Sequence, residues 1–403
     1  MSFISIAEYD YNLTTERIAA VPLSERDASK LLVFSNGFIK DDYFYNLKEY
    51  LPSNSLLILN DTRVIEARIF FTKDTGATIE IFLLEPYQAT IEETLQHTGS
   101  VYWKVLIGGA SKWKPRQILS KTMILDSNNV ELTAKYIKKE DDYFVVQLSW
   151  NSIHVFSDIL HSAGKIPLPP YIKREITELD SVRYQTVFSR NDGSVAAPTA
   201  ALHFTDSILN DLRKKNIDIG YLTLHVGAGT FKPVKTEDIS AHHMHEEPFT
   251  VSKKLLQSIL SAEKIIVVGT TSLRCIESIY WMGIKLMNGQ LNNEWSIHQW
   301  EPYSLADKEE KKDFKIVIQT IIEWMNLHQL ETIHGKTSLM IVPGYSFTIP
   351  DAIITNFHLP KSTLLLLVSA FTNNNWKKIY EHALANDYRF LSYGDSSLLW
   401  RNK

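Results

Sequence analysis

Short apolar runs that end in polar residues recur along the chain and set its predicted architecture. Such compact runs, bounded by turn residues, are typical of buried strands. Stretches that suit helices stand between them, and this alternation predicts an α/β fold with a large mixed α/β domain. The clearest strand candidates are residues 56–60, 217–225, 265–268 and 352–355.

The segment 341–371 combines strand, loop and helix signals. The apolar run 352–355 is followed by NFHLPK at 356–361, and Ser362 and Thr363 then precede the apolar stretch 364–371. A hydroxyl pair before an apolar run is typical of a helix start. The segment therefore predicts strand, loop and buried helix, with a polar loop at a helix end that favours anions. An ordinary connection with a capped helix and a surface lysine would give the same pattern.

Residues 68–150 have a different pattern. Short alternating runs are separated by turn residues, at 77–84, 102–107, 122–125 and 143–148. Several short strands at regular spacing predict a small β-barrel or sandwich. We therefore expect a second β domain at 68–150, inserted into a larger α/β domain made of 1–67 and 151–403.

Two glycine-containing segments follow predicted strands. The strand at 265–268 leads into Gly269-Thr270-Thr271-Ser272 and then a helix, which is a plausible anion cradle but lacks the lysine of a Walker motif. The pair Gly227 and Gly229 is too short for a dinucleotide fingerprint.

Polar residues at predicted strand ends are the candidate chemistry. His203, His225 and His358 each follow an apolar run. A single such histidine is more often part of the core, but several at strand ends indicate a site if the strands share one direction. The run Asn60-Asp61-Thr62-Arg63 reads equally as a binding edge or as a turn closed by its own side chains.

The run HHMHEE at 242–247 lacks the ligand spacing of helical zinc sites, so we expect no metal and a proton-transfer or hydrogen-bonding role. The single cysteine, Cys275, excludes an internal disulfide and a multi-thiolate metal site. The formal charge of −4 argues against indiscriminate nucleic-acid binding, but not against a local patch. The N-terminal residues do not resemble a secretory signal and no apolar run is long enough to span a bilayer, which together predict a cytoplasmic protein.

Taken together, long blocks of this sequence resemble one family, the S-adenosylmethionine:tRNA ribosyltransferase-isomerases of queuosine biosynthesis. The blocks run in order along almost the whole chain: RDASKLL (26–32), LNDTRVIEAR (59–68), PLPPYIKRE (167–175), RYQTVF (183–188), GSVAAPTAALHFT (193–205), LTLHVGAGTFKPV (222–234), HHMHEE (242–247), VGTTSLRCIES (268–278), PGYSF (343–347), ITNFHLPKSTLLLLVSAF (354–371) and YRFLSYGDSSLL (388–399).

The resemblance implies a large α/β domain with an inserted small β-barrel domain. It implies that S-adenosylmethionine is a co-substrate whose ribosyl part is transferred and isomerised onto 7-aminomethyl-7-deazaguanine at the wobble position of tRNA. The products are epoxyqueuosine-tRNA, adenine and methionine. No metal, membrane or obligate protein partner is expected.

Proton removal beside sulfur and departure of adenine need a base and an acid. The candidates for these roles are His203, His225, His245 and His358. The candidates for substrate and cofactor contacts are Asp61, Arg63, Thr199, Gly227, Gly229, Thr230, Thr270, Thr271, Arg274, Asn356, Lys361 and Ser362.

The sequence departs from the family blocks at several positions. Glu66 replaces a proline, Ala201 a glycine, and Glu246 a serine. The segment 281–335, with a predicted helix at about 308–328, is longer than the usual family connection and is expected to be an insertion. Two alternatives stay open: a diverged paralogue that cleaves S-adenosylmethionine but modifies another acceptor, and a non-catalytic RNA-binding relic.

Overall fold

The computed structural model describes residues 4–114, 116–227, 237–291, 294–307 and 311–401. Within these residues the larger sheet contains ten strands in the order β16-β17-β14-β13-β3-β15-β18-β19-β1-β2. Its central strands β13, β3, β15 and β18 are parallel neighbours. The strands are β1 Lys30–Ser35, β2 Phe38–Tyr43, β3 Ser55–Asn60, β13 Asp218–Leu224, β14 Glu247–Ser252, β15 Lys264–Val268, β16 Trp295–Ile297, β17 Thr332–Thr337, β18 Ala352–Asn356 and β19 Ser396–Trp400.

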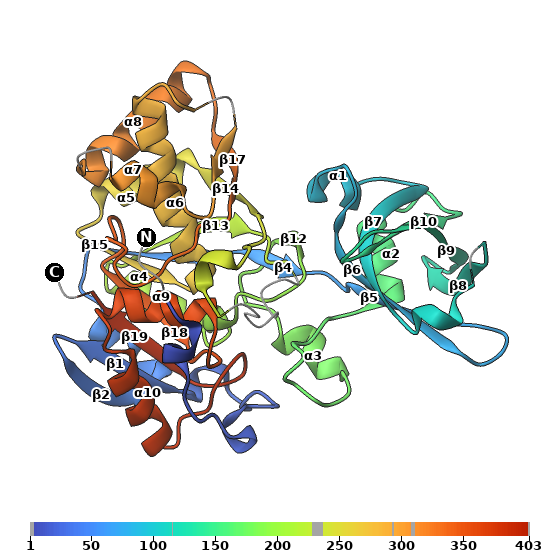
Figure 1. Cartoon of the computed structure of the whole chain (residues 1–403), viewed down its shortest axis with the longest axis horizontal. Coiled ribbons are helices and arrows are strands. Elements are labelled where there is room, and N and C mark those ends of the chain that lie inside the picture. Colours follow the sequence, from blue (N-terminus) through green and yellow to red (C-terminus); the bar gives the residue numbers. More distant parts are fainter. Residues whose placement is uncertain (1–3, 115, 228–236, 292–293, 308–310, 402–403) are drawn as a thin grey trace.

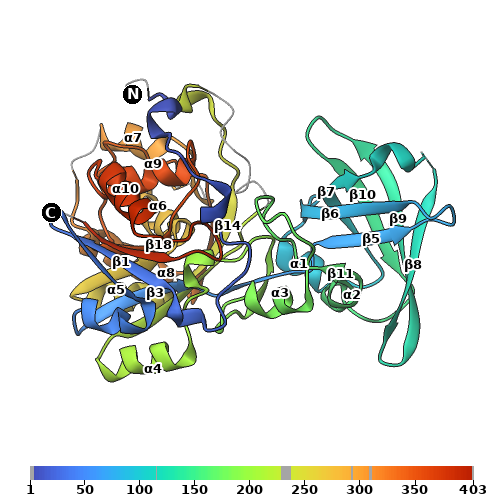
Figure 2. The ribbon, with the colours of Figure 1, turned by 90° about the horizontal axis from the view of Figure 1, so that it is seen from below.

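Both faces of the central strands are buried because neighbouring residues point into different cores. In β3, Leu56 and Ile58 belong to one apolar cluster, and Leu57 and Leu59 belong to another. Helices α5, α6, α8, α9 and α10 contribute to the first cluster and α4 to the second, which gives three layers (Figures 1 and 2). These helices are α4 Asp206–Lys214, α5 Lys253–Ser261, α6 Thr270–Met287, α8 Phe314–Leu327, α9 Thr363–Phe371 and α10 Trp376–Ala385. The mixed α/β prediction is confirmed.

A second, antiparallel sheet stands apart from the first (Figure 1). Seven described strands form it, in the order β11-β5-β6-β7-β10-β9-β8. Its apolar core includes Trp103 and Phe71, and α2 adds Phe156 to it. The elements are β5 Arg68–Thr72, β6 Thr78–Pro86, α1 Ile91–Leu95, β7 Ser100–Gly108, β8 Ile118–Leu125, β9 Asn128–Lys139, β10 Phe144–Trp150, α2 Phe156–Ala163 and β11 Gly164–Lys165.

The seven-stranded sheet and its core continue past residue 150 through α2 and β11. Closure of this sheet into a barrel and the predicted domain boundaries stay predictions. Two short parallel strands, β4 Thr62–Val64 and β12 Asn191–Ser194, lie between the two sheets (Figure 1). Helix α3, Glu178–Arg183, lies near them.

The ten-stranded sheet with its covering helices is called the larger body, and the seven-stranded sheet with α1 and α2 is called the smaller body. The segment 281–335 is part of the larger body. Its expected helix is α8, preceded by the separate helix α7, Glu301–Ala306, and β16 and β17 extend the sheet. A Cβ on Gly283 of α6 would lie 2.3 Å from Val317 of α8, so these helices pack very closely. This segment contributes apolar residues to the core of the ten-stranded sheet. That it is an insertion relative to the family stays a prediction.

No helix among the described residues is long and apolar enough to cross a membrane. The same part of the chain contains no group of three or more His, Cys, Asp or Glu side chains placed to hold a metal ion.

Candidate active site

Polar residues gather at one edge of the larger sheet because its central strands run in the same direction. The carboxyl ends of β3, β13, β15 and β18 lead into Asp61, His225, Gly269 and Phe357, respectively. The condition that the strands share a direction is therefore met for His225 and His358, whereas His203 follows a short 3-10 helix, Thr199–Ala201, and not a strand. In open α/β sheets, this edge is where ligands bind.

A cavity of about 130 Å³, here called the strand-end cavity, lies at this edge. It brings together seven of the residues that the sequence singled out, and these come from three separate segments of the chain. They are Thr199, Thr270, Thr271, Asn356, His358, Lys361 and Ser362.

Two helix N-termini face the strand-end cavity. Helix α6 starts after Gly269, whose φ of +91° is easily adopted only by glycine. Helix α9 starts after Ser362, whose hydroxyl accepts a hydrogen bond from the Leu365 backbone nitrogen at 3.2 Å. Both helix ends carry partial positive charge and favour an anionic ligand group. The predicted strand, loop and capped helix of this segment are confirmed.

Asn356 links the strand-end cavity to His203. The Thr199 hydroxyl donates to Asn356 Oδ1 at 2.9 Å, and Asn356 Nδ2 lies 3.4 Å from His203 Nε2. Ser29 Oγ lies 2.9 Å from the other ring nitrogen. Burial lowers the pKa of His203 to about 4, so the ring is neutral at pH 7. His203 thus fixes Asn356 from behind the cavity.

His358 is also held in its neutral form. Its Nε2 lies 2.9 Å from Thr355 Oγ1, and burial lowers the pKa of the imidazole to about 3. The backbone nitrogen of His358 donates to the Tyr380 hydroxyl at 2.9 Å, which fixes the loop. Lys361, beside it, forms a half-exposed ion pair with Asp10 at 2.7 Å.

His225 lies in a second and larger space, here called the inter-body cleft. This cleft of about 720 Å³ is lined from both bodies: α1 and the ends of β6 belong to the seven-stranded side, and β14, β17 and the end of β13 to the ten-stranded side. Its polar lining residues include Glu92, Lys104, His225, Glu246, Glu294, His334 and Lys336. Gly227 lines it as well.

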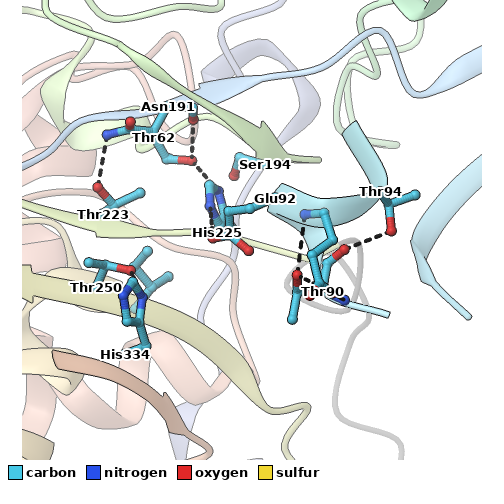
Figure 3. Close-up of polar contacts among 12 residues, drawn as sticks. Thr62, Thr90, Glu92, Thr94, Asn191, Ser194, Thr223, His225, Thr250 and His334 are labelled. Atoms are coloured by element: carbon cyan, nitrogen blue, oxygen red, sulfur yellow. Dashed lines mark hydrogen bonds and ion pairs between the residues drawn. The ribbon is translucent and has the colours of Figure 1, made fainter. Parts of the chain in front are cut away.

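A chain of contacts positions the His225 ring (Figure 3). Nδ1 lies 2.8 Å from Thr62 Oγ1, and that hydroxyl is directed at the Asn191 carbonyl at 3.4 Å. On the other side of the ring, Nε2 lies 3.6 Å from Glu92 Oε1 of α1. The His225 ring lowers the pKa of Glu92. This contact joins the two bodies.

Gly193 permits this arrangement. A Cβ at this position would lie 2.8 Å from the His225 ring and 2.9 Å from Ile91 of α1. Its φ of +146° is also strained for residues with a side chain. The close approach of β12, His225 and α1 therefore depends on a glycine at this position.

Asp61 and Arg63 make contacts within the protein. Asp61 Oδ1 accepts hydrogen bonds from Asn191 Nδ2 at 3.0 Å and Thr223 Oγ1 at 2.7 Å. Arg63 Nε lies 3.7 Å from Asp192 Oδ1. The Asn60 side chain closes the turn by bonding the backbone of Thr62. In the lining of the two spaces, as far as the structure describes it, neither Asp61 nor Arg63 appears.

The remaining candidates lie elsewhere. Arg274 forms a buried ion pair with Glu247 at the start of β14, which neutralises its charge. His245 is exposed and, among the described lining residues, belongs to neither space. Gly229 and Thr230 lie outside the described residues.

Sequence reasoning missed several residues that the structure places at these sites. Glu92 carries no local signal, because its partner His225 is far away in the sequence. Tyr171 and Ser392 line the strand-end cavity, and a hydrogen bond of 2.6 Å joins their hydroxyls. Tyr171 lies in the family block PLPPYIKRE and Ser392 in the family block YRFLSYGDSSLL. Membership of these blocks was the signal that could have identified both residues. Glu66, noted as a departure, lies 2.7 Å from His161 of α2.

Comparisons with known proteins identify the family of this chain. The family model described as queuosine biosynthesis protein matches residues 6–399. The chain is 35% identical to the S-adenosylmethionine:tRNA ribosyltransferase-isomerase of Azoarcus sp., over 99% of this chain and 98% of that protein. It is 37% identical to the protein of the same name from Sulfurihydrogenibium sp., over 98% and 100%. The crystal structure of S-adenosylmethionine tRNA ribosyltransferase from Thermotoga maritima is 26% identical over 97% of this chain and 99% of that one, with a TM-score of 0.46. The extent of the family match and the identity of the relatives show that the chain belongs to the queuosine biosynthesis protein family, the S-adenosylmethionine:tRNA ribosyltransferase-isomerases.

Proposed function

We propose that this protein transfers and isomerises the ribosyl part of S-adenosylmethionine onto 7-aminomethyl-7-deazaguanine at the wobble position of tRNA. The products are epoxyqueuosine-tRNA, adenine and methionine. The observation that carries the proposal is the strand-end cavity, which gathers hydroxyl, amide and imidazole groups from segments far apart in the sequence, in a member of this family. The reaction is proposed to need no metal and to take place in the cytoplasm.

The strand-end cavity suits part of S-adenosylmethionine. The N-termini of α6 and α9 favour a carboxylate, such as that of the methionine part. The hydroxyls of Thr270 and Thr271 and the amide of Asn356 provide hydrogen-bonding groups for ribose or adenine. Lys361 places a cation at the edge of the same space.

We propose different roles for the buried histidines His203 and His358 and for His225. A base or acid for proton transfer works best when its pKa lies near the working pH. Burial lowers the pKa of His203 to about 4 and that of His358 to about 3, so both rings suit hydrogen bonding in the neutral state. We assign proton transfer to His225 from its position, because its ring lies beside the Glu92 carboxylate and lines the larger cleft.

The test is adenine release from S-adenosylmethionine, with and without tRNA that carries 7-aminomethyl-7-deazaguanine, followed by mass analysis of the tRNA nucleosides. We expect adenine release together with epoxyqueuosine in the tRNA. Adenine release without epoxyqueuosine would favour a paralogue with another acceptor. Failure to bind S-adenosylmethionine would favour the non-catalytic relic.

A further inference from the structure

The inter-body cleft contains an imidazole–carboxylate pair, His225 and Glu92, whereas the described lining of the strand-end cavity contains no carboxylate. His225 is only 7% exposed, whereas the carboxylate of Glu92 is 61% exposed and accessible from the cleft. Ile91 and Phe249 provide apolar surface beside this pair. The volume of about 720 Å³ falls within the range of ligand sites, roughly 300–1,000 Å³.

The hydrogen bonds of His225 leave one ring nitrogen facing Glu92. The Thr62 hydroxyl is directed at the Asn191 carbonyl, so its oxygen receives the Nδ1 hydrogen of a neutral His225 ring. When this ring is neutral, Nε2 carries no hydrogen and lies 3.6 Å from a Glu92 carboxylate oxygen, so both atoms are acceptors. A proton gained by Nε2 turns the contact into an ion pair. A ligand with several N–H donors and a positive charge satisfies both acceptors.

We propose that the inter-body cleft receives the acceptor nucleotide, with Glu92 binding its aminomethyl ammonium group and His225 Nε2 accepting a proton from it. This inference rests on the proposed function, which supplies an acceptor with a primary amine. Such an amine is protonated near pH 7 and must lose a proton before it can attack carbon.

The proton balance is simple. An N–H bond of the ammonium breaks, and the hydrogen bonds to His225 Nε2. The electron pair of that bond stays on the nitrogen, which becomes a neutral amine and a nucleophile. The resulting imidazolium lies beside the Glu92 carboxylate, which stabilises it.

The two spaces are placed for a donor and an acceptor to meet. Val226 lines both, and the neighbouring residues Val195 and Ala196 line the cleft and the strand-end cavity, respectively. A ribosyl donor in the cavity and a base in the cleft would therefore lie on the two sides of Val226, the second residue after β13.

The experiment compares wild-type protein with Glu92→Gln and with Glu131→Gln, a control that removes an exposed carboxylate of β9 outside the described lining of both spaces. Dissociation constants are measured for S-adenosylmethionine, for tRNA with 7-aminomethyl-7-deazaguanine, and for the same tRNA with guanine there. We expect wild type to prefer the aminomethyl tRNA and Glu92→Gln to lose about tenfold of that preference, with S-adenosylmethionine binding within twofold of wild type. Glu131→Gln should keep the preference, and Glu92→Asp should restore part of it.

An unchanged preference in Glu92→Gln would overturn the inference. So would a selective loss of S-adenosylmethionine affinity, because the cleft would then hold the ribosyl donor. Formation of epoxyqueuosine by the wild type is scored separately. Its absence overturns the proposed function, whereas its presence with an unchanged Glu92→Gln preference overturns only the assignment of the cleft.

Discussion

The strand-end cavity and the inter-body cleft are built in different ways. The ends of parallel strands, two helix N-termini and the neutral, buried His358 form the cavity, and all of its lining residues belong to the larger body. The cleft exists only where α1 of the smaller body faces β13, β14 and β17, and its central contact is the 3.6 Å approach of Glu92 to His225. The cavity is therefore formed by the larger body alone, whereas the cleft is formed by the contact between the two bodies.

This difference separates two tasks. A cavity held by buried hydrogen bonds loses little freedom on binding, which suits orientation of a small co-substrate. A wide cleft with charged walls suits one nucleotide of a large partner. Damage to the cavity should affect reaction of S-adenosylmethionine, whereas damage to the cleft should affect the tRNA step.

The largest expected effect is in the cavity. Asn356→Ala leaves the Thr199 hydroxyl without its acceptor and removes the amide beside His203. Loss of one well-placed polar group in an active site costs on the order of 100-fold in rate. Adenine release should fall by about that factor. Asn129→Ala, an exposed residue of β9 in the smaller body, is the control and should be unaffected. Release near the wild-type rate in Asn356→Ala would remove the cavity from the reaction.

The second prediction concerns stability against pH. The pKa of His203 is about 4 in the folded protein and near 6.5 when unfolded. The unfolded chain therefore binds more protons between these values, and the free energy of unfolding falls as the pH decreases through this window. From pH 7 to pH 5 the loss from this residue is about 2 kcal/mol.

Urea denaturation at several pH values measures this loss. His203→Gln should be less stable at pH 7 but should show a flatter dependence between pH 7 and pH 5. His97→Gln, an exposed histidine in the smaller body, should keep the wild-type slope. Equal slopes in wild type and His203→Gln would contradict a neutral, buried His203.

The smallest effect is expected from crowding the cleft. Gly193→Ala places a methyl group 2.8 Å from the His225 ring and 2.9 Å from Ile91, which must separate. We expect about a tenfold slower modification of tRNA, with S-adenosylmethionine affinity unchanged. Gly289→Ala also adds a side chain at a positive φ, +66°, but has open space around it, so it should modify tRNA normally. Loss of S-adenosylmethionine affinity in Gly193→Ala would show that the cavity and the cleft are not separable.

Local patterns predicted much of the larger body. The segment Gly269-Thr270-Thr271-Ser272 indicated the start of α6, and the hydroxyl pair Ser362-Thr363 indicated the start of α9. These features depend on backbone hydrogen bonds between near neighbours, and near neighbours are visible in a sequence. The long helix of the segment 281–335 was also predicted, but its start was placed about six residues too early, in a charged run that precedes the Asp313 cap of α8.

By itself, the sequence determined the α/β class, the family blocks and seven polar residues that share one cavity, because parallel strands bring their carboxyl ends to the same edge. Only the tertiary structure decided how each polar group is used. It pairs Arg274 with Glu247, occupies Asp61 with Asn191 and Thr223, and sets Glu92 against His225. Arg274 and Glu247 are 27 residues apart in the sequence, and Asp61 and Thr223 are 162 residues apart. Glu92 and His225 belong to different bodies. Charge pairing at such separations depends on packing, which no local pattern contains.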